Sequence, residues 1–175
     1  MRAVFDPNVL VSATISARGA PRKLLHRWAG GAFELVASAE VLFELQEVLT
    51  RPKFRRYVTL EQVRDYVLWL HDHAAEVSEE LPWDVVQGVT TDPDDDYIAG
   101  VAYLGQADLI VSGDPHLTNL DSIRRGDGGM IARVLTPAPS STSWIEVRNR
   151  PRLRECKTLR LVGRGKRFPK GGEQC

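Results

Sequence analysis

The sequence predicts an α/β fold in which one parallel sheet is covered by helices on both faces, over residues 1–136. Short apolar runs of strand length alternate along the chain with amphipathic segments of helix length. Gly, Pro, Asp or Asn separate most of these segments. A chain of 175 residues, 43% hydrophobic and 26% charged, also has the size and composition of a single globular domain.

Four apolar runs are predicted to be buried strands of this sheet. They are Ala3–Phe5, Phe33–Ala37, Leu109–Val111 and Ile131–Leu135. Asp6-Pro7-Asn8 ends the first of them. Between Val77 and Gly88 the pattern is too irregular to assign, although Val85-Val86 suits a short strand.

Start and stop signals place helices between these strands. The predicted helices begin near Ala20, after the N-cap Ser38, after a capping box of Thr59 with Gln62, and after Asp92-Pro93. They end at Gly30, at Arg51-Pro52, at about Glu76 and at Gly105. Each carries its apolar residues on one stripe, which predicts that this stripe packs on the sheet.

The formal net charge of zero conceals an uneven distribution. Residues 137–175 carry ten Lys and Arg against three acids, which leaves 13 basic and 20 acidic residues in the first 136. We expect 137–175 to form a basic, loosely ordered tail, since its composition is that of a linker. The tail is either a solvated surface or a segment that binds something negative.

The N-terminus has no apolar stretch long enough for a signal peptide or a membrane span, which favours a cytoplasmic location. Both cysteines, Cys156 and Cys175, lie near the other end of the chain. A metal bound by the predicted domain would therefore use oxygen or imidazole ligands.

Two aspartates follow predicted strands. Asp6 comes directly after Ala3–Phe5, and Asp114 follows Leu109–Val111 after two residues. In open parallel sheets, ligands bind beyond the carboxyl ends of the strands, so both acids lie where a site would form. Either one alone is more simply a turn residue or a helix cap.

Glu44 adds a third carboxylate. It borders the apolar stripe of its helix, between Val41 and Val48. A carboxylate at the edge of a buried face must be paired, hydrogen-bonded or metal-bound to offset its desolvation. A salt bridge to a nearby arginine is the simpler explanation for this one residue.

Four acids crowd the run Asp92-Pro93-Asp94-Asp95-Asp96 at a predicted helix start. Helix dipoles favour one or two acids there, but four repel one another, and a divalent cation would relieve that repulsion. Asp95 shares a helix face with apolar residues and is predicted to point inward, whereas Asp94 and Asp96 project to its flanks and Asp92 caps the helix. Alternatively, Asp95 only completes a capping box.

These oxygen donors suit Mg²⁺ or Mn²⁺. The histidines weaken competing interpretations, because His71 and His73 point to different faces of their helix and His26 is isolated. His116 lies near Asp114, although a solvent-facing loop histidine is the commoner case. No Ser-His-Asp order, glycine-rich phosphate loop or paired CxxC motif stands out.

Over residues 1–136 the ordered motifs resemble the PIN-domain family, and within it the VapC-like toxins of toxin–antitoxin systems. The motifs are Asp6-x-Asn8-Val9-Leu10, the segment Ser38–Leu49 with Glu44, Arg51-Pro52-Lys53-Phe54, Asp92–Asp96 and Val111-Ser112-Gly113-Asp114. The resemblance implies a small α/β ribonuclease that uses Mg²⁺ or Mn²⁺ and is held inactive by an antitoxin. It places Asp6, Glu44, Asp95 and Asp114 on the metal-binding acids.

Three positions depart from the family pattern. Pro7 stands where the family usually has Thr or Ser, Ser112 where Thr is common, and His116 where another acid often occurs. Pro7 removes a hydroxyl and a backbone N–H near the metal, which predicts weaker activity or a poorly held second metal.

The resulting hypothesis is hydrolysis of RNA phosphodiester bonds by a metal-activated water, with Glu44 assisting. The expected partners are an RNA substrate and an antitoxin protein; no membrane is expected, and a homodimer is compatible with the resemblance. The alternative is a catalytically weakened PIN-fold module that binds RNA or an antitoxin. An aspartate phosphotransfer domain lacks its lysine here, and a haloacid-dehalogenase-type phosphatase would need a second Asp at Asn8.

Overall fold

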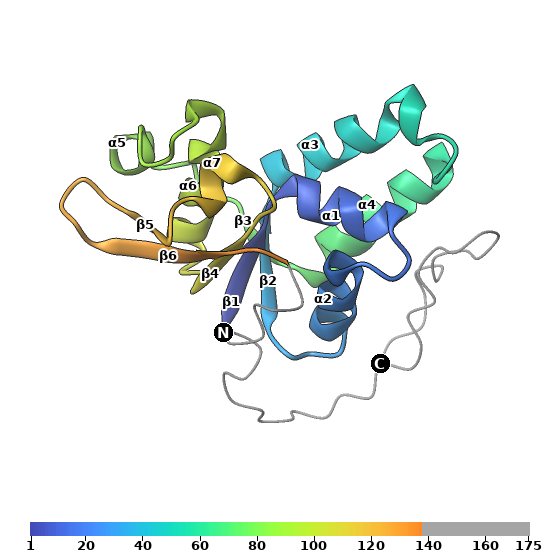
Figure 1. The fold of residues 1–175 in the computed structure, drawn as a ribbon, viewed down its shortest axis with the longest axis horizontal. Helices are drawn as coiled ribbons and strands as arrows, with labels where there is room; N and C mark the ends of the chain where they lie inside the picture. Colours follow the sequence, from blue (N-terminus) through green and yellow to red (C-terminus); the bar gives the residue numbers. More distant parts are fainter. Residues whose placement is uncertain (138–175) are drawn as a thin grey trace.

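The computed structural model describes residues 1–137, which form a six-stranded sheet with helices on both faces (Figure 1). The predicted tail, with both cysteines, lies outside the described residues apart from Pro137. The strand order is β3-β2-β1-β4-β6-β5. The predicted α/β fold with a parallel sheet is therefore confirmed, with one antiparallel strand at an edge.

The strands are short and mostly buried. They are β1 (Arg2–Phe5), β2 (Glu34–Ser38), β3 (Ala75–Val77), β4 (Leu109–Val111), β5 (Ser122–Arg124) and β6 (Met130–Leu135). All neighbouring pairs are parallel except β5 with β6. In the centre, Val4 of β1 is in register with Val36 of β2 and Ile110 of β4. Such fully buried runs, apolar on both sides, are typical of strands covered by helices on both faces.

Four helices lie on one side of the sheet in Figure 1. They are α1 (Pro7–Ile15), α2 (Ala20–Ala29), α3 (Ala39–Thr50) and α4 (Leu60–His73). The predicted caps are present: the Ser38 side chain accepts from the Val41 backbone N–H, and Thr59 and Gln62 form a complete capping box. Thus α3 begins directly where β2 ends, which carries Glu44 to the carboxyl edge of the sheet.

The other side of the sheet holds α6 (Asp96–Leu104), with the short helices α5 (Trp83–Val86) and α7 (Pro115–Thr118) above it (Figure 1). A 3₁₀ turn, η2 (Pro93–Asp95), leads into α6, and a second, η1 (Pro52–Phe54), follows α3. Because α6 starts at the carboxyl edge and ends at Gly105, near the start of β1, it spans the height of the sheet.

Three sequence predictions differ from the structure. The segment Asp6-Pro7-Asn8 is expected only to end a strand, but it also begins helix α1, with Asp6 as the N-cap. The helix expected to reach Glu76 ends at His73, because Ala75–Val77 pairs with β2. The suggested strand at Val85-Val86 is the end of α5, and β5 had not been predicted. In residues 1–137, no helix is both long and apolar enough to cross a membrane.

Gly105 allows α6 to approach the sheet closely. A Cβ atom at this position would lie 2.4 Å from Cγ1 of Val36. We therefore expect Gly105→Ala to lower the free energy of unfolding by about 1–3 kcal/mol through overpacking. Thermal unfolding measures this, and Gly126→Ala is the control, because nothing lies within 4 Å of its added Cβ. Equal melting temperatures for the two variants would contradict the expectation.

Candidate metal centre

The ends of β1 and β4 bring two of the predicted acids to one place. The chain proceeds from β1 to β2 and β3 in one direction, and β4 then returns to the opposite side of β1. Such a reversal opens a crevice at the carboxyl edge of a parallel sheet. The Asp6 backbone N–H extends the strand pairing by donating to the Val111 carbonyl at 3.0 Å. Asp6 and Asp114 therefore both lie at the carboxyl edge where the strand order reverses.

The Ser112 hydroxyl connects these two acids. This fully buried side chain donates to Oδ2 of Asp6, and its oxygen accepts from the Asp114 backbone N–H at 2.9 Å. Burial raises the pKa of the Asp6 carboxyl, with smaller contributions from the negative charges of Glu44 and Asp114. The hydrogen bonds from Ser112 and from the Asn8 backbone act against that rise. Asp6 is thus a buried carboxylate close to two others.

Three Asp-Pro pairs in the chain share one local structure. Oδ1 of Asp6 accepts from Asn8 N–H at 2.7 Å, and Oδ1 of Asp114 accepts from His116 N–H at 2.8 Å. Asp92 does the same at η2. Each Asp is an N-cap followed by Pro at the first helical position, where no N–H is needed. The capping role considered for Asp6 and Asp114 is therefore real, and it uses Oδ1 of each carboxylate.

Asp95 is the member of the acidic run that holds an unsatisfied buried oxygen. Its Oδ2 is buried and has no hydrogen-bond partner in the described part of the chain, and Asp95 makes no capping hydrogen bond at the start of α6. Burial raises the pKa of Asp95 to about 6, together with the negative charges of Asp114, Asp6 and Asp92, while His116 lowers it. A buried oxygen without a partner beside other acids is a place for a cation.

Of the two neighbours of Asp95, one lies as expected and the other does not. Asp94 is exposed, as predicted, but Asp96 is only 2% exposed instead of projecting to a flank. The Asp96 carboxylate accepts from Gly88 N–H at 2.5 Å and from the Thr90 N–H and hydroxyl at 3.0 and 2.7 Å. Since η2 ends at Asp95 and α6 begins at Asp96, the three acids do not follow one regular helix. Asp96 holds the preceding loop.

Glu44 reaches the site from α3 and is held there by a tyrosine. The Tyr97 hydroxyl donates to Oε2 of Glu44 at 2.5 Å, across 53 positions of sequence. Burial, and then this bond to Glu44, raise the pKa of the Tyr97 hydroxyl far above its usual value, so it stays a donor. No arginine or lysine within residues 1–137 forms a salt bridge with Glu44. The salt-bridge alternative for Glu44 is therefore wrong.

The donor atoms and charges of the four carboxylates suit a hard divalent cation. All donors are oxygens, the charges of Glu44 and Asp114 act on Asp6, and Asp95 has an unsatisfied buried oxygen. Across the described residues, no three His, Cys, Asp or Glu side chains are gathered tightly enough to form a complete metal site. Mg²⁺ commonly binds through one or two carboxylates and keeps several waters, so it does not require such a closed set.

Several residues around the acids were missed or only partly understood from the sequence. The sequence marks Ser112 only as a departure from a family pattern, and no motif in it points to Tyr97. His116 is exposed, and its Nδ1 lies 3.4 Å from the Thr91 hydroxyl. The signal that could have indicated Tyr97 is its place in α6, three and four residues before the buried Gly100 and Val101.

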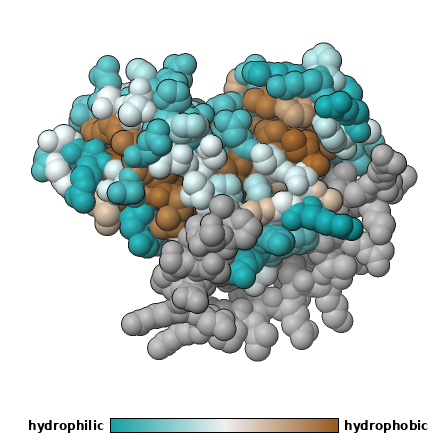
Figure 2. Space-filling view, in the orientation of Figure 1, coloured by the Kyte–Doolittle hydropathy of each residue, from teal (hydrophilic) through white to brown (hydrophobic). Residues whose placement is uncertain are grey.

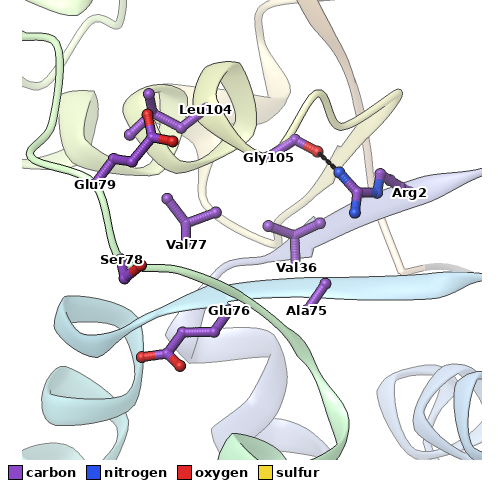
Figure 3. Close-up of a pocket in the computed structure, with 9 residues that line it drawn as sticks. All are labelled: Arg2, Val36, Ala75, Glu76, Val77, Ser78, Glu79, Leu104 and Gly105. Carbon is purple, nitrogen blue, oxygen red and sulfur yellow. Dashed lines mark hydrogen bonds between the residues drawn. The ribbon is translucent and has the colours of Figure 1, made fainter.

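A separate hollow lies along β2 and β3, under the end of α6 (Figure 3). Val36 and Val77 point into it, whereas Glu76 points to the other side of β3. Arg2 borders it and donates to the Gly105 carbonyl at 2.6 Å. Arg2 begins β1 and Asp6 follows its end, so this hollow and the acids lie at opposite ends of that strand. It contains no comparable group of converging acids.

Comparisons with known proteins agree with this architecture. A family model described as "PIN domain" matches residues 2–116. Among solved structures, the fold resembles a chain in the crystal structure of VapBC2 from Rickettsia felis bound to a DNA fragment from their promoter. The TM-score is 0.51 at 17% identity, over 78% of this chain and 98% of that one. No curated protein matches the sequence.

The raised pKa of Asp95 predicts a stability change with a definite sign. The folded, metal-free protein binds this proton more tightly than the unfolded chain, so the contribution of Asp95 to stability is favourable below about pH 4 and is lost as the pH rises through about 6. Asp95→Asn should therefore raise the free energy of unfolding at pH 7 in chelator by about 1 kcal/mol after solvent screening, and with it the melting temperature. This gain should vanish near pH 4.

Asp94→Asn is the matched control, since it removes the same charge from the neighbouring residue, whose side chain is exposed. Thermal melts of both variants at several pH values test the prediction. A lower melting temperature for Asp95→Asn at pH 7 would show instead that Asp95 supports the helix start.

Proposed function

Because this chain belongs to the PIN-domain family, we propose that it is a divalent-metal-dependent ribonuclease and the toxin of a toxin–antitoxin pair. The family resemblance implies nuclease chemistry with Mg²⁺ or Mn²⁺. Asp6, Glu44, Asp95 and Asp114, the acids that the motif pattern assigns to the metal, come from four separate segments of the chain and lie near one edge of the sheet.

The observation that carries the proposal is the buried Oδ2 of Asp95. It has no partner within residues 1–137, although an unpaired buried carboxylate oxygen is costly. The negative charges of Asp6 and Asp114 act on it and make its ionised form less favourable still. We infer that the functional protein binds a cation here, which would pair the free oxygen of Asp95 and offset the repulsion from Asp6 and Asp114.

In this proposal Asp6, Asp95 and Asp114 hold the metal directly or through water. Asp6 keeps its position through Ser112 and Asn8, and Asp114 through His116 N–H, so each carboxylate is oriented before the metal arrives. A bound Mg²⁺ or Mn²⁺ would supply a more acidic water and offset the charge that develops on the phosphate.

Glu44 is proposed to position the attacking water and to accept its proton. The Tyr97 hydroxyl occupies Oε2, which leaves the other carboxylate oxygen for this role. Tyr97 is thus a positioning residue, since it acts through Glu44. Fixing a carboxylate in this way reduces the rotamers that it must lose when substrate binds.

One observation favours the second candidate, a PIN-fold module with weakened catalysis that binds RNA or an antitoxin. The described acids do not form a complete set of three ligands, and Pro7 is buried beside Asp6 without a hydroxyl to offer. Incubation of labelled RNA with the protein, in Mn²⁺ and in chelator, separates the two candidates. Binding without metal-dependent cleavage would favour the module.

The partner and the cellular setting belong to the same proposal. The likeness of the fold to a chain of VapBC2 supports an antitoxin partner, and an RNA substrate follows from the nuclease assignment. A homodimer and a cytoplasmic location remain predictions of the sequence. Purification of the chain with the product of a neighbouring open reading frame would test for an antitoxin.

Cleavage of labelled RNA should require Mg²⁺ or Mn²⁺, and Asp6→Asn or Asp95→Asn should reduce its rate at least 100-fold, because each change removes a ligand charge and keeps the shape. Mn²⁺ binding, measured by calorimetry, should weaken in the same two variants. Asp94→Asn, at the exposed neighbouring acid, should retain both properties. Full cleavage by folded Asp6→Asn protein would contradict the assignment of the centre.

Tyr97→Phe should slow cleavage about tenfold and raise the Mn²⁺ concentration needed for half-maximal rate, because Glu44 loses its donor. Tyr103→Phe is the matched control, as it removes a hydroxyl from the same helix, away from Glu44. The dependence of rate on Mn²⁺ measures the effect. A change in melting temperature alone, with an unaltered Mn²⁺ dependence, would make Tyr97 merely structural.

A further inference from the structure

The turn between α3 and α4 combines positive charge with aromatic rings. Its seven residues, Arg51-Pro52-Lys53-Phe54-Arg55-Arg56-Tyr57, contain four basic side chains and two aromatic ones. We call this segment the basic turn. It stands out because the described domain is acidic, with 13 basic residues against 20 acids in the first 136.

One of the four basic residues has a structural role. Arg55 donates to the carbonyls of Leu49 and Thr50, at 3.4 and 2.5 Å, and so satisfies the end of α3. Arg51, Lys53 and Arg56 are exposed and form no salt bridge within residues 1–137. Three cations of the basic turn are therefore available to a partner.

The aromatic rings lie directly against these cations. Nζ of Lys53 is 4.9 Å from the centre of the Phe54 ring, and Cζ of Arg56 is 4.8 Å from that of Tyr57. Phe54 is half-buried against the core, whereas Tyr57 is 43% exposed. Exposed aromatic rings interleaved with Arg and Lys are typical of surfaces that bind single-stranded nucleic acid, since bases stack on the rings while cations contact phosphates.

The basic turn is held in a defined conformation. The 3₁₀ turn η1 begins at Pro52, and the N–H groups of Tyr57 and Val58 both donate to the Phe54 carbonyl. Val58 is buried, and the Thr59 capping box starts α4 immediately afterwards. A surface fixed in this way loses little conformational entropy when a ligand binds.

Helix α3 sets the distance between the basic turn and the candidate metal centre. Arg51 follows Glu44 by seven residues, which corresponds to about 10 Å along a helix axis. Figure 1 shows α3 leading from the sheet edge outward to this turn, and Figure 2 shows hydrophilic residues over that outer end. A strand of nucleic acid at the acids would have neighbouring phosphates within reach of the turn.

We propose that the basic turn binds the phosphates and a base of single-stranded RNA next to the cleavage centre. The inference rests on the proposed function and adds where the substrate is held. The acidic centre repels the phosphate backbone except where a cation is bound, so productive binding needs positive charge beside it. The three free cations of the basic turn supply this charge, and Tyr57 supplies a stacking surface.

The test compares two triple variants of the full chain, both carrying Asp6→Asn so that RNA stays intact. One has Arg51→Gln, Lys53→Gln and Arg56→Gln; the other has Arg18→Gln, Lys23→Gln and Arg27→Gln, which removes equal charge from exposed positions in and beside α2. Fluorescence anisotropy with a short fluorescein-labelled single-stranded RNA is measured over a salt series.

The basic-turn variant should bind about tenfold to 100-fold more weakly, with a slope of log K against log salt shallower by about 2, since each phosphate contact on a single strand contributes roughly 0.7. The α2 variant should match the parent. Lys53→Gln alone should lower the slope by roughly 0.7, and Tyr57→Ala should weaken binding about tenfold without changing the slope. These single variants decide the matter if the triple variant does not fold.

Equal losses in both triple variants, no loss in either, or no RNA binding by the parent would overturn the inference. Cleavage by the protein with native Asp6 is measured separately. Cleavage with unaltered binding in the basic-turn variant would leave the proposed function intact and reject this inference. Weakened RNA binding by the basic-turn variant, together with no cleavage by the native protein, would support this inference and reject the proposed ribonuclease activity.

Discussion

The pairing of β1 with β4 is the constraint on which the candidate centre depends. These strands lie more than a hundred residues apart in sequence, and their register places Phe5 beside Val111, so that the next residues of both strands leave the sheet together. The Ser112 hydroxyl then joins Asp6 to the backbone of Asp114. Without this pairing the two acids would be separate helix caps. With it, the fold buries the Asp6 carboxylate near the half-buried Asp114, and the desolvation and repulsion that raise the pKa of Asp6 follow directly.

The acids show how one side chain can serve both folding and function. In Asp6 and Asp114, Oδ1 caps a helix, so a part of each carboxylate is committed to local structure. Asp95 and Asp96 divide the two roles between neighbours instead: Asp96 fixes the preceding loop through Gly88 and Thr90, and Asp95 retains a buried oxygen that the described chain does not satisfy. A buried oxygen without a hydrogen-bond partner is a stronger indication of a ligand than the number of acidic residues in a segment.

Much of the fold could be predicted from local patterns, because apolar runs and capping residues act over a few positions. The strands at Ala3 and Leu109 and the capping box at Thr59 are of this kind. Helix α1 is not predicted because Asp6-Pro7 resembles a break after a strand, although Asp-Pro begins a helical segment here as it does at Asp92. Strand β3 depends on pairing with β2, which no local pattern reveals. The four acids could be predicted from the motif order, but Tyr97 and Ser112 act on them through contacts over 53 and 106 positions.

The bond between Tyr97 and Glu44 joins helices from opposite faces of the sheet. Tyr97 belongs to α6 and Glu44 to α3, and the two side chains meet over the carboxyl edge that separates the layers. The geometry of Glu44 therefore depends on both layers, because α3 carries the carboxylate and α6 supplies the hydroxyl that fixes it.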